Sequence, residues 1–327
     1  MKLLKTLVFT TLLSSNAYAV TNGTSVNWND YQDMVEMDCT GTIIAGKFIL
    51  TAAHCSNTDY IRFSDQTSSS SIQRVDHQDA TLDGAMVDVS LWTLPTTREI
   101  TKIHYFANLT NENVVVNDEK LRLFGFGRTT TENDPLHYAT VNAYFDPIRP
   151  QAIDGKFINQ GSGIYGDSGG AWLNKDDQIV AINKSIYGGT TFGTNLHYAK
   201  DFILDTINGW HYPTLANTSN GSVTIKVQSL HDTNAVYDAT TSGDAQIIGS
   251  TCESTIQPFQ TCTYTIESQG GTGTLHLSDS ESITINKQAP TTESSGDGDS
   301  GGSLGFLSLI GLLGLGLIRK RYDTSAK

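Results

Sequence analysis

The stretch IYGDSGG at residues 164–170 constrains this chain more than any other. Serine is a weak nucleophile at its own pKa, so a catalytic serine needs a neighbouring base and backbone N–H groups aimed at the developing oxyanion. Gly166 and Ser168 can supply those N–H groups, because a glycine turn lifts the serine hydroxyl clear of the backbone. The stretch alone also fits an ordinary Gly/Asp/Ser turn. A histidine and a carboxylate elsewhere must complete the site.

Two upstream segments carry these residue types. TAAHC places His54 after the apolar run 41–50, and DVSLW begins a strand-like run with Asp88. Together with GDSGG they resemble the signatures of the chymotrypsin/trypsin-like serine protease family, in the family's order of His, Asp and Ser. The resemblance covers residues 20 to about 210. It implies that His54 acts as general base and then acid, that Asp88 orients the imidazole, and that Ser168 attacks the acyl carbon.

The resemblance also implies an oxyanion hole and an activation pair. The N–H groups of Gly166 and Ser168 would form the oxyanion hole. A new N-terminal amine, here on Val20, would pair with the buried carboxylate of Asp167. An ionised carboxylate without a partner in a low-dielectric interior costs on the order of several kcal/mol. Relatives generally keep a propeptide before that amine. Here cleavage after Ala19 would itself create the terminus, so we expect signal peptidase to activate the enzyme.

The substrate pocket is implied by the same resemblance. The residue six before the nucleophile, here Ser162, lies at the base of the family's primary specificity pocket, where an aspartate selects Arg or Lys. Without that carboxylate a buried cation stays uncompensated, so we expect weak cleavage after Arg or Lys. Ser185, Tyr187 and Gly193 would form the walls, and a one-residue slip in the alignment would bring Lys184 closer. An inward Tyr187 would narrow the pocket and favour small to medium apolar residues.

The net charge, the N-terminal segment and the cysteines indicate the cellular compartment of the protein and exclude one class of partner. The net charge of −13 argues against a nucleic-acid partner. Residues 1–19 have the basic start, short apolar core and small-residue cleavage site of a secretory signal peptide, and export permits disulfides. The resemblance implies a bridge between Cys39 and Cys55, which leaves Cys252 and Cys262 to pair across a hairpin. Neither pair has zinc-like spacing with histidine, so we expect no metal site. The acyl-enzyme chemistry of the resembled family requires no cofactor, and we expect none.

The strand signals predict an all-β fold. Short β-branched or aromatic runs with turn-forming neighbours occur at 41–50, 59–63, 86–94, 113–116 and 120–126. With the resemblance they indicate two six-stranded antiparallel β-barrels, chymotrypsin-like, in a protease domain over residues 20–212. Residues 201–207 have helical spacing and would form the C-terminal helix of that domain, with a further strand as the alternative.

The remaining third of the chain changes in composition. We expect a linker at 213–221, a small β-sandwich domain at 222–288 that is either a binding module or a spacer, and a solvated acidic spacer at 289–302. Residues 303–321 would form a short hydrophobic tail helix with a basic end.

The tail also resembles a sorting signal. Its Gly301-Gly302 pair, apolar run and basic cluster resemble the GlyGly-CTERM tail of Gram-negative bacteria. That resemblance implies type II secretion, transient anchoring in the inner membrane, and removal by a rhomboid-like protease. A permanent C-terminal membrane anchor is the alternative.

The sequence therefore predicts a serine endopeptidase of a Gram-negative bacterium that is secreted or displayed at the cell surface. It would hydrolyse protein or peptide substrates through an acyl-enzyme. The alternative is a non-catalytic surface adhesin on a protease scaffold, in which residues 222–287 bind the partner. The sequence does not choose between a processing and a digestive protease.

Overall fold

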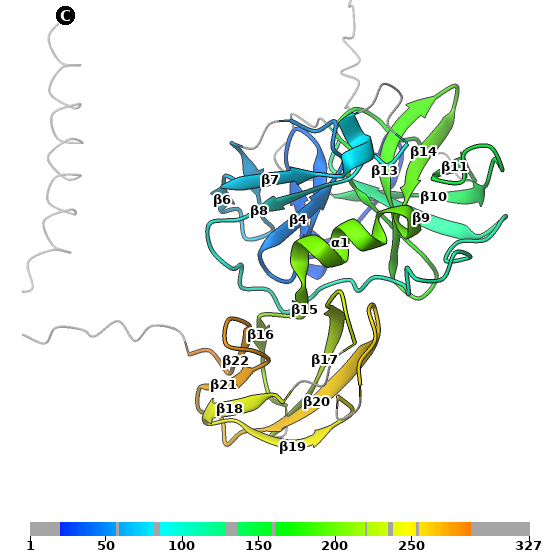
Figure 1. Cartoon of the computed structure of the whole chain (residues 1–327). Coiled ribbons are helices and arrows are strands. Elements are labelled where there is room, and N and C mark those ends of the chain that lie inside the picture. Colours follow the sequence, from blue (N-terminus) through cyan, green and yellow to red (C-terminus); the bar gives the residue numbers. More distant parts are fainter. Residues whose placement is uncertain are drawn as a thin grey trace, which may run out of the picture. The chain divides into compact units, whose positions relative to one another are not determined.

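The chain is built almost entirely from short strands (Figure 1). The structure is a computed structural model, and it describes residues 20–56, 59–81, 86–127, 136–158, 161–219, 221–234, 238–252 and 255–288. The predicted signal peptide, acidic spacer and tail helix lie outside these residues. Within the described ranges, no helix is long and apolar enough to cross a membrane.

The first sheet has seven strands, drawn in blue and cyan in Figure 1, in the order β6-β5-β2-β3-β4-β8-β7. Among the described residues no pairing joins its two edges, so it is a half-barrel, and the prediction of a closed six-stranded barrel is wrong for this half. The edge strand β6 and its neighbour β5 have only two residues each, too few to carry a closing ladder. The strands are β2 (Met34–Glu36), β3 (Thr40–Ile44), β4 (Phe48–Thr51), β5 (Ile61–Arg62), β6 (Ser68–Ser69), β7 (Gln73–Asp76) and β8 (Ser90–Thr93).

The second sheet closes into a six-stranded barrel, as predicted, because β9 pairs with both β10 and β12. Buried and half-buried residues alternate along β10, as expected where every second side chain points into a barrel. The short strand β1 (Thr24–Ser25) adds to β10 from outside. The barrel strands are β9 (Lys120–Gly125), β10 (His137–Tyr144), β11 (Ala152–Phe157), β12 (Ala171–Leu173), β13 (Ile179–Tyr187) and β14 (Thr190–Asn195).

The predicted helix is present as α1 (Lys200–Ile207). It buries Ile203 and Leu204 and ends at Asn208, whose φ of +38° turns the chain out of the helix. Short 3₁₀ turns lie at η1 (Trp28–Asp30), η2 (Gln78–Thr81) and η3 (Leu196–Ala199).

The strand predicted at 113–116 is absent, and the segment is a run of turns. The Asn111 side chain accepts the N–H of Asn113 at 3.0 Å, and the Glu119 carboxylate accepts the N–H of Val116 at 3.1 Å. These side chains satisfy backbone donors that a sheet ladder would otherwise take.

Two four-stranded sheets follow, in the orders β15-β17-β20-β19 and β16-β22-β21-β18. They share one hydrophobic cluster, which includes Ile225 and Tyr264 from the first sheet and Leu275 and Ile283 from the second. The strands are β15 (Gly209–His211), β16 (Leu215–Ala216), β17 (Ser222–Leu230), β18 (Thr240–Gly243), β19 (Gln246–Ser250), β20 (Thr261–Glu267), β21 (Gly273–His276) and β22 (Ser282–Ile285).

Strands β15 and β16 fall in the predicted end of the protease domain and in the predicted linker. Tertiary pairing with β17 and β22 overrides their turn-rich composition. The buried Gln228 amide bonds the backbone of Phe106, accepting from its N–H at 3.0 Å and donating to its carbonyl at 2.8 Å. The later sheets are therefore hydrogen-bonded to the segment between the first sheet and the barrel.

Candidate active site

His54 and Asp88 meet just beyond the ends of paired strands. His54 follows β4, Asp88 precedes β8, and these strands pair antiparallel with Thr51 opposite Ser90. The His54 Nδ1 lies 2.6 Å from Asp88 Oδ2, and the His54 backbone N–H donates to Asp88 Oδ1 at 2.9 Å. Since a carboxylate only accepts, Nδ1 carries the proton and Nε2 is left as the basic nitrogen.

The environment keeps Asp88 ionised. Its side chain is 5 % exposed, whereas that of His54 is 47 % exposed. Burial acts to raise the pKa of Asp88, but the hydrogen bonds and charge of His54, with a smaller contribution from Lys184, outweigh burial and lower it. A permanent carboxylate beside a half-exposed imidazole suits a histidine that must gain a proton and lose it again.

Arg74 holds the loop that carries His54. Its guanidinium donates to the carbonyls of Ala53 and Cys55, on either side of the histidine, and lies 5.6 Å from the Trp92 ring centroid. The Cys39–Cys55 disulfide fixes the same loop to the start of β3, and the Cys252–Cys262 disulfide is also present, both as expected. No sequence motif marked Arg74, because its role depends on β7 lying beside β8.

The glycines of the serine turn are required by its geometry. Gly166 has a φ of +100° and Gly169 one of +81°, which side chains rarely tolerate. A Cβ on Gly169 would lie 2.1 Å from the Thr51 hydroxyl. The turn therefore packs directly against the strand leading to His54, which brings Ser168 to the histidine side of the molecule. In the described part of the chain, neither Gly166 N–H nor Ser168 N–H donates to a backbone carbonyl.

Thr40 holds both peptide groups of this turn. Its N–H donates to the Ser168 carbonyl at 2.8 Å, and its buried hydroxyl donates to the Gly166 carbonyl at 2.8 Å. The same hydroxyl accepts the N–H of Phe126 at 3.1 Å. Sequence reasoning missed Thr40, which differs little from any other strand threonine in the linear chain.

Asp167 is fully buried behind the turn. Its carboxylate accepts the N–H groups of Ile164 at 2.7 Å and Gly127 at 2.9 Å, and that of the buried Val20. Burial raises the pKa of Asp167 to about 7, even though these hydrogen bonds act to lower it. The two residues of the expected activation pair are thus together.

One cavity of about 670 Å³ contains the three candidate catalytic residues, His54, Asp88 and Ser168. Among the described residues, the rest of its lining is mostly apolar or neutral, with Lys184 the only lysine or arginine. These remaining residues are Ala80, Ile164, Tyr165, Asn183, Lys184, Ser185 and Ile186.

The expected pocket residues are only partly brought together. Ser185 lines the cavity, but Ser162, Tyr187 and Gly193 do not. Ser162 forms a bridge with Thr21, the Tyr187 side chain is 83 % exposed at the end of β13, and Gly193 faces the Trp172 ring. Of the four expected pocket residues, the cavity that contains Ser168 therefore includes only Ser185 among its described lining. Lys184 takes the place beside the site that a one-residue slip would give it.

The trypsin family model matches residues 19–207, more than half of the 327 residues. The chain belongs to the trypsin family. By this family membership it is a chymotrypsin-like serine endopeptidase. No curated protein matches the sequence.

Three solved structures are similar to this trypsin-family chain. The secreted serine protease VesC from Vibrio cholerae is 14 % identical, with a TM-score of 0.46 over 80 % of this chain and 70 % of that one. VesB protease from Vibrio cholerae is 17 % identical, with a TM-score of 0.48 over 80 % and 96 %. A mutant of human heparin binding protein is 16 % identical, with a TM-score of 0.49 over 57 % and 96 %. The family assignment rests on the family model and not on these likenesses.

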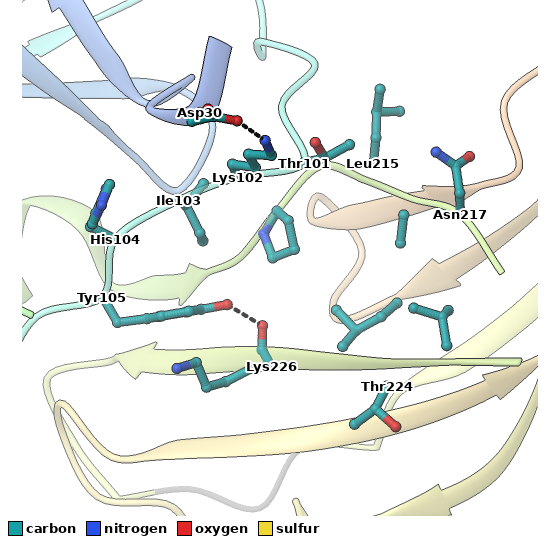
Figure 2. A pocket seen from close by; sticks show the side chains of 14 residues that line it. Asp30, Thr101, Lys102, Ile103, His104, Tyr105, Leu215, Asn217, Thr224 and Lys226 are labelled. Carbon is teal, nitrogen blue, oxygen red and sulfur yellow. Dashed lines mark hydrogen bonds and ion pairs between the residues drawn. The ribbon is translucent and has the colours of Figure 1, made fainter. Parts of the chain in front are cut away.

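A second cavity in this trypsin-family chain, of about 510 Å³, lies between residues 101–105 and 213–226 (Figure 2). Figure 2 shows Lys102 paired with Asp30 and the Tyr105 hydroxyl donating to the Lys226 carbonyl. The Lys226 ammonium lies 4.2 Å from the Tyr105 ring centroid. No serine or cysteine is among the described residues that line this cavity.

Cys39, His54 and Cys55 lie close enough together to resemble a metal-ligand cluster. Both sulfurs are joined in the disulfide and have no thiolate to offer. This cluster is therefore part of the protease framework and not a metal centre.

Proposed function

We propose that the protein is a secreted serine endopeptidase in which Ser168 is the nucleophile, His54 the general base and acid, and Asp88 the residue that orients and charges the imidazole. The observation that carries this proposal is the 2.6 Å contact between His54 and Asp88 on a cavity that Ser168 also lines. The N–H groups of Gly166 and Ser168 would stabilise the oxyanion of each tetrahedral intermediate.

The chemistry follows from these positions. His54 Nε2 would take the Ser168 proton as the hydroxyl attacks the substrate carbonyl, and it would then protonate the leaving amine. Water would hydrolyse the acyl-enzyme by the same route. Within the described residues no hydrogen bond joins Ser168 to His54. Catalytic hydrogen bonds are often long before substrate binds, so the geometry remains compatible with this role.

A fluorophosphonate probe tests this function directly. We expect it to label mature wild-type protein at Ser168 and to leave Ser168→Ala unlabelled, with the variant folded and its kcat lowered by a factor on the order of 10⁴ or more. Active Ser168→Ala protein would refute the assignment. A folded wild-type protein that neither takes the label nor cleaves peptides would favour the alternative of a non-catalytic adhesin.

We propose weak cleavage after Arg or Lys. A basic side chain in the cavity would meet Lys184 and would find no carboxylate in the described lining other than that of Asp88, which His54 already occupies. The side chains of Ile164 and Ile186 favour apolar substrate residues. Rapid hydrolysis of an Arg-ended peptide substrate over a Leu-ended one would contradict this preference.

We further propose that export removes residues 1–19 and that residues 303–327 are a sorting tail cut near Gly301-Gly302 after transient anchoring in the inner membrane. The two C-terminal sheets, which share a hydrophobic cluster, would form a small β-sandwich between protease and tail. The mass of the intact mature protein tests the tail assignment, because Lys327 on surface-localised enzyme is incompatible with cleavage. Replacing the glycine pair should leave the enzyme in the inner membrane.

A further inference from the structure

Strand β17 has a neighbour along only part of one of its two sides. On that side β15 pairs with residues 228–230, and beyond His211 the chain crosses to the other four-stranded sheet as β16. Within the described chain, no strand lies beside residues 224–226 there. The cavity of about 510 Å³ between residues 101–105 and 213–226 lies along this stretch, and we call it the β17 cleft (Figure 2).

The ladder with β20 shows which way the backbone groups of this stretch point. Ser229 uses both its N–H and its carbonyl on the β20 side, at 2.9 and 2.8 Å. Because successive residues of a strand alternate sides, Thr224 and Lys226 direct their N–H and carbonyl groups into the β17 cleft. The Tyr105 hydroxyl already donates to the Lys226 carbonyl. In the described chain no hydrogen bond reaches the two N–H groups or the Thr224 carbonyl, so a guest strand would find two donors and one acceptor.

The charges at the β17 cleft leave one cation without a carboxylate. Lys102 pairs with Asp30, and His104 lies 3.0 Å from the buried carboxylate of Asp33. In the described lining no carboxylate pairs with Lys226, whose ammonium lies 4.2 Å from the centroid of the tyrosine ring in the cleft. An ammonium has three N–H donors, so it can stay over the ring and also bind a carboxylate.

We propose that the β17 cleft binds an extended, carboxylate-bearing segment of a protein substrate, which adds to β17 as a short strand at residues 224–226. This proposal rests on the proposed protease function and names a second substrate-binding site. The free backbone groups would hold the segment, and Lys226 would select Asp or Glu in it. The half-buried side chains of Ile103, Leu215 and Val223 would receive its apolar side chains.

The site acts only on long substrates. In the described chain the β17 cleft and the cavity that contains Ser168 share no lining residue. A short peptide therefore occupies one of them, whereas a protein substrate can occupy both.

A second copy of this chain fits the β17 cleft less well. An unpaired edge is a template for an identical edge, but pairing two β17 strands would bring the two Lys226 side chains close together. Like charges that face each other across a strand pair are destabilising. The net charge of −13 repels a second copy and an acidic segment alike at long range. Salt screens that repulsion beyond about 8 Å, so the contact with Lys226 decides between the two occupants.

Fluorescence anisotropy with mature Ser168→Ala protein tests the binding without cleavage of the probe. The probe is a fluorescein-labelled, end-capped, valine-rich peptide with one central glutamate, and its matched control carries glutamine. We expect the Kd of the glutamate peptide to be lower on the order of tenfold, the effect of one charge-assisted hydrogen bond. Lys226→Met should bring this ratio to about one. Lys175→Met, whose lysine pairs with Asp176 at 2.8 Å, should keep it.

Thr224→Pro tests the strand pairing, because proline removes the N–H at this position. We expect it to weaken both peptides on the order of tenfold, while Thr224→Ala, which keeps the N–H, leaves both unchanged. Peptides N-methylated at alternate residues make the same test without changing the protein. Methylation in one of the two phases should abolish binding, because a strand directs every second N–H toward its neighbour.

Kinetics test whether the occupant belongs to a substrate. A quenched fluorescent peptide that the wild-type enzyme cleaves is joined at either end to the glutamate or glutamine segment. The Gly/Ser linkers have about 10, 20 and 30 residues and span roughly 17 to 30 Å. We expect kcat/KM to be about tenfold higher with the glutamate segment at one linker length, because binding in the cleft raises the local concentration of the scissile peptide. The two segments should give equal values in Lys226→Met.

Three results would overturn the proposal: equal binding of the glutamate and glutamine peptides, equal binding of both N-methylated phases, or equal kcat/KM for the two linked segments at every linker length. In each case hydrolysis of the unlinked peptide leaves the protease function standing. Absence of both hydrolysis and fluorophosphonate labelling at Ser168 would refute the protease function, and with it the assignment of the occupant to a substrate.

Discussion

At the residue scale, the role proposed for Ser168 depends on how firmly its turn is held, and Thr40 donates hydrogen bonds to the carbonyls of Gly166 and Ser168 in that turn. We expect Thr40→Val to lower kcat by about 10- to 100-fold, because the buried Gly166 carbonyl and Phe126 N–H lose their partner at a cost of about 1–3 kcal/mol. Thr40→Ser keeps the hydroxyl and should keep most of the activity. Steady-state kinetics and the rate of fluorophosphonate labelling measure the effect. Equal activity of the Val and Ser variants would rule out this role.

Asp88 allows a sharper test of the triad. Asp88→Asn should lower kcat by a factor on the order of 10⁴, because an amide nitrogen facing the ring would present the wrong imidazole tautomer to Ser168. Circular dichroism should show an unchanged fold. A loss of less than tenfold would mean that Asp88 does not orient the base.

The sequence predicts a site residue when a short local motif marks it, and fails when the role of the residue depends on contacts with segments far away in the sequence. His54, Asp88 and Ser168 stand in short local signatures that mark them as candidates in the sequence, and the structure places all three on one cavity. Thr40 and Arg74 act through contacts with segments remote in sequence, and no local pattern marks them. Tyr187 and Gly193 were named from the resemblance alone, and neither lines the cavity that contains Ser168.

At the element scale, the segment at Val20 and the serine turn act as one unit, because the Val20 N–H reaches the buried Asp167 carboxylate. We expect a protein with one residue added before Val20 to be inactive, since the charged amine can no longer pair with Asp167. Asp167→Asn should be inactive for the same reason. N-terminal sequencing of active enzyme should give Val20 first. Full activity of the extended protein would contradict the assignment.

The same pair predicts a pH dependence of stability. Without the amine, the folded pKa of Asp167 is raised from 3.8 to about 7. Its neutral form is therefore favoured on folding, and that stability is present below pH 4 and lost as pH rises through about 7. We expect urea unfolding of the extended protein to show a loss on the order of a few kcal/mol between pH 5 and pH 8. Asp167→Asn in the extended protein should remove that loss, and an equal loss in this variant would assign it to other groups.

The elements themselves were predictable where local signals were strong. The helix at 201–207 and the strands around His54 and Asp88 carry clear periodicity and are present. The polar strand β10 has histidine, asparagine and threonine among its residues and gave no signal, although it helps to close the barrel. The sequence also did not predict that the first sheet is open, because barrel closure depends on pairing between the two edge strands and not on the composition of any one strand.

At the scale of the whole molecule, the amide of Gln228 joins the later sheets to Phe106. Gln228→Leu would leave the buried N–H and carbonyl of Phe106 without this partner, so we expect stability to fall by about 2–4 kcal/mol. We also expect one thermal transition to separate into two. Gln246→Leu, on an exposed position of β19, is the control. Scanning calorimetry measures both effects, and an unchanged single transition in Gln228→Leu would show that the amide does not couple the sheets.

Strand β15 has a consequence for the evolution of the chain, because it joins the protease domain to the last two sheets. Trp210 packs in the hydrophobic cluster of the last two sheets, while its neighbour His211 accepts the N–H of Ala45 and contacts the His104 carbonyl. Two adjacent residues thus belong to different interiors, Trp210 to that of the last two sheets and His211 to that of the protease domain. Dividing the chain within residues 213–221 would therefore not separate the two domains cleanly. A gene rearrangement that removed or exchanged the later sheets would expose the protease interior. We therefore expect the two parts to have been passed on as one unit, with sequence drift confined to surfaces and to the tail beyond Gln288.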